Sequence, residues 1–191
     1  MMRYMVEPGT ILKFQTETME FIATPRETGD RYSVRMTVTP GGGPGVRGFG
    51  PHIHDGSTEI FTCISGTMTY RLGREFGELG PGGRIAVPPG NVHGFKNTGD
   101  DPLIADVDIV FASPGPTAET DFVPIGVTVA RLLEEGKISR FTGLPPILQL
   151  AVVEDAYPKA MREAGLPGLL MPPLAWLGRR LGYKADPFAD A

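Results

Sequence analysis

The residues best suited to chemistry lie in one short segment that contains His52, His54 and Glu59. In a β-strand, residues two positions apart share a face, so the imidazoles of His52 and His54 should point the same way. Asp55 and Gly56 favour a chain reversal, and across such a hairpin His54 and Glu59 become neighbours on one face. Imidazole and carboxylate groups gathered in this way are typical ligands of a transition-metal ion.

A fourth ligand must come from elsewhere in the chain. The only remaining histidine is His93, which follows the turn Pro88-Pro89-Gly90. Four protein ligands leave one or two positions open on an ion that prefers five or six, which is typical of a catalytic site rather than of a closed structural one. These ligand types suit one divalent ion of Fe, Mn, Ni, Cu, Co or Zn, and they do not choose among them.

Short β-strands between Ile11 and about Phe111 should position these residues. The runs Tyr32 to Thr39 and Leu103 to Phe111 alternate apolar and polar side chains, as in strands that bury one face and expose the other. Glycine and proline are abundant, at 26 and 19 residues, as expected where tight turns join many short strands. This pattern predicts a β-sandwich or barrel.

The two histidine-containing blocks resemble the two conserved motifs of the cupin superfamily. The first block reads His-x-His, four residues, Glu59, six residues and Gly66. The second reads Gly82, five residues, Pro88-Pro89-Gly90, two residues, His93, three residues and Asn97. One position departs from the family pattern, because the glycine expected six positions before the first histidine falls on Val46, beside Gly45.

The resemblance covers roughly Ile11 to Pro114 and implies a mainly β fold, a double-stranded β-helix or jelly-roll barrel with the metal near one mouth. It further implies that one transition-metal ion is held by three histidines and one carboxylate, namely His52, His54, Glu59 and His93. By the same resemblance, three further motif residues would have structural roles in turns and at strand ends: Gly66, Gly90 and Asn97.

Because every second residue of a strand lies on the same face, the positions of the ligands predict which side chains line a mostly apolar pocket beside the ion. Counting by twos from the ligands, and along the next strand, gives five side chains: Phe61, Cys63, Met68, Tyr70 and Phe95. Packing in the core is the simpler role for each of them, and Cys63 is expected to be a small buried hydrophobe. Tyr70 is the best candidate among them for a hydrogen bond to a substrate.

The site favours a small-molecule dioxygenase or a related metal-dependent oxidoreductase, similar in its site to quercetin-type dioxygenases. Such a reaction asks little of the protein beyond the ion, since Glu59 could change from ligand to general base. Cupins that isomerise sugars need an additional acid or base, and no histidine is spare. The alternative is a non-catalytic module that binds or senses a small molecule through the metal. Hydrolase or isomerase activity would require a further polar pocket residue that the sequence does not identify.

After Pro114 the alternation gives way to helical spacing, which predicts a cupin β-barrel at residues 1–115 and a C-terminal helical extension at 116–191. One helix is expected from Pro124 to Gly136. A second begins near Pro146, buries residues as far as Met161 and is kinked or split by Pro158. A third carries an apolar stripe formed by Leu170, Leu174, Leu177 and Leu181.

We expect the apolar stripes of these helices to pack on the barrel or on a second subunit, which would give a homodimer. A lid over the mouth of the barrel is one alternative. An interfacial membrane helix around Trp176, Arg179, Arg180 and Lys184 is another, weakened by Pro172 and Pro173.

The composition disfavours several other classes of function. The formal net charge is -4 and the basic residues are scattered, so no nucleic-acid surface is indicated. The most apolar stretch, Leu166 to Leu177, is too short to span a bilayer and contains three prolines. A single cysteine, Cys63, and an N-terminus without a signal-peptide pattern indicate a reducing, cytoplasmic location. The expected partner is a small-molecule substrate.

Overall fold

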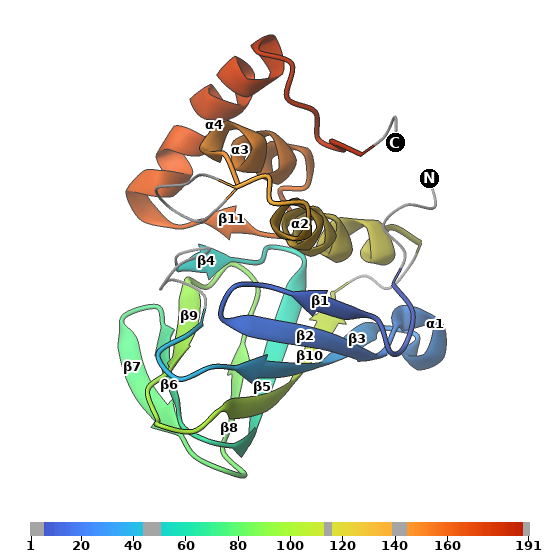
Figure 1. Cartoon of the computed structure of the whole chain (residues 1–191). Helices are drawn as coiled ribbons and strands as arrows, with labels where there is room; N and C mark the ends of the chain where they lie inside the picture. Colours follow the sequence, from blue (N-terminus) through green and yellow to red (C-terminus); the bar gives the residue numbers. More distant parts are fainter. Residues whose placement is uncertain (1–5, 44–50, 113–115, 139–144, 189–191) are drawn as a thin grey trace.

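The computed structural model of the chain describes residues 6–43, 51–112, 116–138 and 145–188. Two antiparallel β-sheets form one part of the molecule, and the helices of the C-terminal third lie together on one side of them (Figure 1). The position of Val46, where the sequence departs from the family motif, and the predicted boundary at residue 115 both lie outside the described residues.

The first sheet has the strand order β1-β2-β3-β10-β5-β8. Its strands are β1 (Ile11–Lys13), β2 (Glu17–Ala23), β3 (Arg31–Val38), β10 (Leu103–Phe111), β5 (Ser57–Ser65) and β8 (Arg84–Val87). The second sheet has the order β11-β4-β9-β6-β7. Its strands are β11 (Arg162–Glu163), β4 (His52–Ile53), β9 (His93–Asn97), β6 (Met68–Leu72) and β7 (Glu75–Leu79).

This arrangement confirms the predicted mainly β, jelly-roll class with a helical extension. Within the described residues the two sheets are hydrogen-bonded separately, so the β region is an open jelly roll rather than a closed barrel. The alternation along β3 and β10 works as predicted, because every second side chain of each strand is buried. One apolar core joins the sheets, since Val34 and Val107 of the first belong to the same cluster as Met68 and Phe95 of the second.

The helices are α1 (Pro25–Thr28), α2 (Pro116–Glu134), α3 (Ile147–Ala156) and α4 (Gly165–Arg180). The prediction that a helix begins at Pro124 is wrong, because α2 begins at Pro116 and Pro124 lies inside it. Proline is favoured at the start of a helix, but here the helix continues on both sides of Pro124. The second helix ends before Pro158, and Met161 is buried beyond its end.

Of the predicted leucine stripe, only Leu174 packs on the rest of this chain, where it is partly buried against the cluster that contains Ala151 and Val152 of α3. The buried residues of α4 are Met171, Ala175 and Gly178, whereas Leu170, Leu177 and Leu181 are exposed. The helix packs on α3 through its small residues, because a Cβ at Gly178 would lie 2.8 Å from Cγ2 of Val152 and 2.9 Å from the carbonyl oxygen of Leu148. The other three leucines of the stripe lie outside this contact. None of the helices in the described ranges is long and apolar enough to cross a membrane.

Candidate metal centre and cavity

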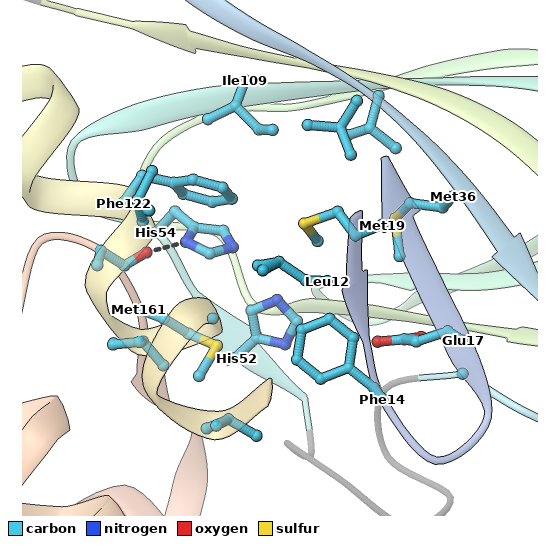
Figure 2. Close-up of a pocket in the computed structure, with 18 of the residues that line it drawn as sticks. Leu12, Phe14, Glu17, Met19, Met36, His52, His54, Ile109, Phe122 and Met161 are labelled. Atoms are coloured by element: carbon cyan, nitrogen blue, oxygen red, sulfur yellow. Dashed lines mark hydrogen bonds between the residues drawn. The ribbon is translucent and has the colours of Figure 1, made fainter. Parts of the chain in front are cut away.

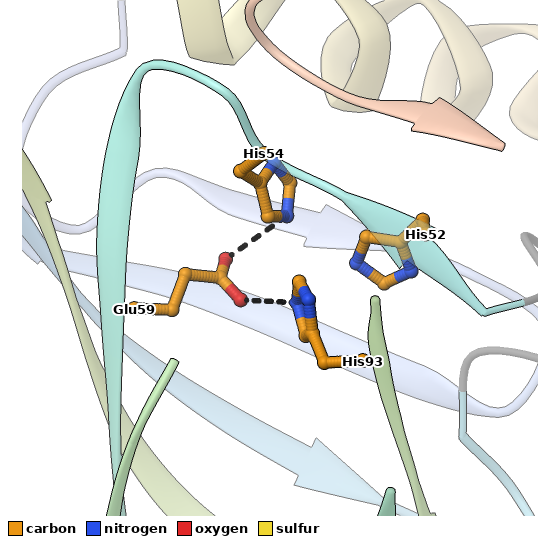
Figure 3. Close-up of side chains that lie close together, drawn as sticks. All are labelled: His52, His54, Glu59 and His93. Carbon is orange, nitrogen blue, oxygen red and sulfur yellow. Dashed lines mark hydrogen bonds and ion pairs between the residues drawn. The ribbon is translucent and has the colours of Figure 1, made fainter. Parts of the chain in front are cut away.

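The structure brings His52, His54, Glu59 and His93 together in one buried cluster (Figure 3). One possible ligand atom from each residue lies within 4.8 Å of the others. His52 and His93 are direct partners across β4 and β9, and their ring centroids are 4.4 Å apart. The three nitrogen donors and one carboxylate therefore meet as the sequence indicated.

The route by which Glu59 reaches His54 differs from the predicted hairpin. β4, which carries His52, belongs to the second sheet, and β5, which carries Glu59, belongs to the first. The chain crosses from one sheet to the other at Asp55 and Gly56, so His54 and Glu59 face each other across the space between the sheets. Nε2 of His54 lies 3.3 Å from Oε1 of Glu59.

Backbone carbonyl groups orient two of the three imidazoles. Nδ1 of His54 donates a hydrogen bond to the carbonyl oxygen of Ala160, and Nδ1 of His93 donates one to that of Asn91 at 3.1 Å. Because a carbonyl oxygen can only accept, each Nδ1 carries the hydrogen, and Nε2 of each ring faces Glu59. Ligating histidines usually have such a partner on the second ring nitrogen. The arrangement therefore fits a metal ion at the Nε2 atoms.

The electrostatics of the cluster also suit a cation. Burial alone would raise the pKa of Glu59, but the charge of His54 and the hydrogen bond and charge of His93 outweigh it and lower that pKa to about 2. For His93, burial acts in the opposite direction and lowers the pKa. The hydrogen bond with Glu59, which measures 2.9 Å from Nε2 to Oε2, outweighs burial and raises the pKa of His93 above its ordinary value. Glu59 is thus an anion at neutral pH in a setting that attracts positive charge.

A cavity of about 370 Å³ adjoins the cluster, and His52, His54 and Glu59 form part of its wall (Figure 2). Of the five side chains predicted for the pocket, Phe61 and Phe95 line this cavity. Met68 and Tyr70 instead line a much smaller hollow behind His93. Cys63 is fully buried in the apolar core, and it lines neither hollow.

The helices supply a large part of the cavity wall, whereas the pocket residues predicted from the sequence all came from the strands and a helical lid was only an alternative. α2 contributes an apolar face with Phe122, Ile125 and Val129, and α3 contributes Ile147 and Leu150. The spacing of the α2 residues by three and four positions is that of one helical face, so this signal was present in the sequence. What was missing was the surface against which that face packs.

Polar residues of the cavity were also missed, among them Gln15, Thr16 and Glu163. Glu17, at the start of β2, lines the cavity, and its Oε2 atom is buried without a hydrogen-bond partner. Burial raises the pKa of its carboxyl group to about 7. The local signal was the alternation of polar Thr18 and Glu20 with apolar Met19 and Phe21, which puts Glu17 on the apolar face of the strand.

The C-terminal region also takes part in the sheet that carries the cluster. β11 pairs with β4, which places Glu163 opposite His52. Nε of Arg162 lies 2.6 Å from Oδ2 of Asp55, the residue that follows His54. Together with the carbonyl group of Ala160, these contacts make the residues after α3 a support for the cluster rather than a separate appendage.

Comparison with known proteins gives one family match. Residues 34–110 match the family model described as "Cupin domain". No protein of curated function matches the chain.

Several solved structures are similar to part of this chain. KdgF from a Halomonas species is 20% identical, with a TM-score of 0.45, over 53% of this chain and 87% of that one. A predicted oxalate decarboxylase from Thermotoga maritima is 22% identical, with a TM-score of 0.45, over 50% and 80% of the two chains. The Cupin_2 domain of an XRE-family transcriptional regulator from Enterobacter cloacae is 17% identical, with a TM-score of 0.44, over 52% and 100%. At this distance, nothing about a ligand is carried over from these proteins.

Proposed function

We propose that this chain, which contains a cupin domain at residues 34–110, binds one divalent transition-metal ion and acts with it on a largely apolar small molecule. The ligands would be His52, His54, Glu59 and His93. The observation that carries the proposal is that their donor atoms lie within 4.8 Å of one another in a buried cluster, and that three of the four residues, His52, His54 and Glu59, form part of the wall of a mostly apolar cavity. Cavities of this size and character commonly hold small molecules.

When bound, the ion would supply Lewis acidity and, if redox-active, electrons for chemistry on the substrate. The protein's own part is to hold the imidazoles in one tautomer and to exclude water with the apolar side chains of the sheets and of α2. Because the carboxylate of Glu59 faces Nε2 of both His54 and His93, we infer that Glu59 is first a ligand, and that service as a general base requires its carboxylate to turn into the cavity.

Metal content tests the first part of this proposal. We expect protein purified without added metal to contain about one transition-metal ion per chain by elemental analysis, and His52→Ala and His93→Ala to lose it. Tyr70→Phe is the matched control, since Tyr70 lies outside the cluster, and it should keep the ion. Wild-type protein that neither retains an ion after loading and buffer exchange nor melts at a higher temperature with it would refute the metal site.

We propose a dioxygenase or related oxidoreductase as the activity, with non-catalytic, metal-dependent binding as the second candidate. The largely apolar cavity and the ligand set support the first, because an oxygenase needs few further protein groups. Anaerobic loading with Fe(II), followed by oxygen-uptake measurements with a panel of phenols and diketones, separates the two. Oxygen consumption that depends on both substrate and metal supports the enzyme, whereas ligand binding without turnover for any metal supports the binding module.

We further propose a cytoplasmic homodimer with a β region at residues 1–115 and a helical extension at 116–191. Cys63 is buried and makes no disulfide, which suits a reducing compartment. The exposed leucines of α4 offer a surface that a second copy could cover. Sedimentation of the wild type and of Leu169→Glu/Leu170→Glu, both on that exposed face, shows whether the surface is used: a dimer that dissociates in the variant supports the proposal, and a monomeric wild type opposes it.

A further inference from the structure

Glu17 lies where an apolar side chain would be expected. It is the first residue of β2, and the alternation of the strand places it on the same face as Met19 and Phe21. All three side chains line the cavity. A carboxyl group in this row needs an explanation, because Met19 and Phe21 are the kind of residue that fills the core.

One oxygen of the Glu17 carboxyl group, Oε2, is buried and has no hydrogen-bond partner in the described part of the protein. A buried polar atom without a partner costs free energy comparable to a lost hydrogen bond, and most such atoms in folded proteins are paired. An unpaired one inside a ligand-sized cavity is therefore a group that a ligand can satisfy.

The surroundings of Glu17 separate it from the polar groups of the cluster. Figure 2 shows its carboxyl group pointing into the cavity, beside Phe14 and on the side of His52. It comes from β2 in the first sheet, whereas the histidines come from the second sheet and its adjoining turn. Between these two sets of polar groups the walls are mostly apolar, with Leu12 and Met36 among the lining residues.

We propose that Glu17 is the second polar anchor of the cavity and selects a flat or compact apolar molecule that carries a hydroxyl or carbonyl group for this carboxyl. A second oxygen function of the same molecule would face the metal centre. Only this second contact rests on the proposed function, because it requires the metal. The contact with Glu17 needs no metal. It also supplies the additional polar residue whose apparent absence from the sequence disfavoured acid–base chemistry in the cavity.

A pair of matched probes tests this proposal in the full chain. 2-Naphthol carries a hydroxyl group, and naphthalene has the same rings without it. Binding of each is measured by fluorescence to the wild type, to Glu17→Leu, to Glu17→Gln and to Glu20→Gln, with and without bound metal. Glu20 lies on the same strand but on its opposite face, paired with Arg35, so Glu20→Gln is the control.

In the wild type and in Glu20→Gln, 2-naphthol should bind about tenfold more tightly than naphthalene. Glu17→Leu should abolish this preference while retaining naphthalene, and Glu17→Gln should restore a large part of it because an amide still offers hydrogen bonds. Equal preferences in the wild type and Glu17→Leu would overturn the inference. Because the comparison is repeated without metal, failure of the metal site leaves the Glu17 result readable, and failure at Glu17 leaves the metal result intact.

Discussion

At the scale of single residues, Glu17 imposes a free-energy cost that depends on pH. The pKa of its carboxyl is about 7 in the folded protein against an ordinary value of 4.5. The folded state therefore binds more protons than the unfolded state between these values, and stability is lost as pH rises through this window. The cost is absent below about pH 4.5 and complete above about pH 7, where it amounts to roughly 3 kcal/mol.

Glu17→Gln should remove this dependence, because its amide does not ionise. In metal-free protein, we expect the difference in unfolding free energy between Glu17→Gln and the wild type to shift in favour of the variant as pH rises from 5 to 8. Urea unfolding at several pH values measures it, and Glu20→Gln corrects for loss of a surface charge on the same strand. A difference that stays constant with pH would show that the carboxyl is not buried as described.

Also at this scale, the histidines and Glu59 could be predicted from the sequence while Glu17 could not. The motif residues are separated by short, fixed intervals, so strand parity alone aligns His52 with His54. Parity places Glu17 on the same face as Met19 and Phe21, but a carboxyl group at the end of a strand is usually exposed. That this face lines a cavity depends on residues of β4, α2 and α3 that are distant in the sequence, and such long-range packing was not predictable.

At the scale of elements, the turn between β5 and β6 carries the chain from the first sheet to the second. Gly66 in this turn has φ 82°, and a Cβ there would lie 2.8 Å from Cα of Leu103 and 2.9 Å from the carbonyl oxygen of Pro102. Gly73, in the turn between β6 and β7, also has a positive φ, 60°, but a Cβ there meets nothing within 4 Å. The two glycines thus share the backbone requirement and differ in crowding.

This contrast makes a matched pair of substitutions. Gly73→Ala should cost about 1–2 kcal/mol for the left-handed backbone conformation alone. Gly66→Ala should cost roughly 2 kcal/mol more, because backbone atoms of Pro102 and Leu103 must move as well. Thermal or urea unfolding compares them, and equal losses would mean that the close approach at Gly66 is not a constraint.

The same scale shows where helical patterns mislead. The leucines of α4 repeat at helical spacing, which predicts that they form its buried face, yet only Leu174 of the stripe is partly buried, and Ala175 and Gly178 are buried residues that face α3. Small residues permit the closest approach of two helices, and they leave a weaker hydropathy pattern than leucine does. Apolar periodicity therefore predicted the position of the helix in the sequence, but it did not predict which face of the helix packs on α3.

At the scale of the whole molecule, the C-terminal residues and the β region form one site. The cavity lies between them, Ala160 accepts a hydrogen bond from His54, and β11 extends the sheet at β4. Arg162 joins the two parts at the surface through Asp55, with contacts of 2.6 Å and 3.2 Å. Because Arg162 is two residues from Ala160 and Asp55 is next to His54, this ion pair holds together the two ends of the hydrogen bond that orients His54.

Arg162→Ala should therefore weaken metal binding more than it weakens the fold. Exposed ion pairs contribute at most about 1 kcal/mol to stability, whereas loss of groups that orient a ligating histidine lowers metal affinity by roughly tenfold or more. Arg179→Ala is the control, because Arg179 pairs with Asp155 at 2.7 Å with similar exposure but joins α4 to α3 away from the cluster. Metal titration in competition with a chelator, alongside urea unfolding, gives both quantities. Equal affinities in the two variants would mean that the extension covers the cavity without positioning the metal centre, whereas a loss confined to Arg162→Ala would make the helical extension part of the metal site itself.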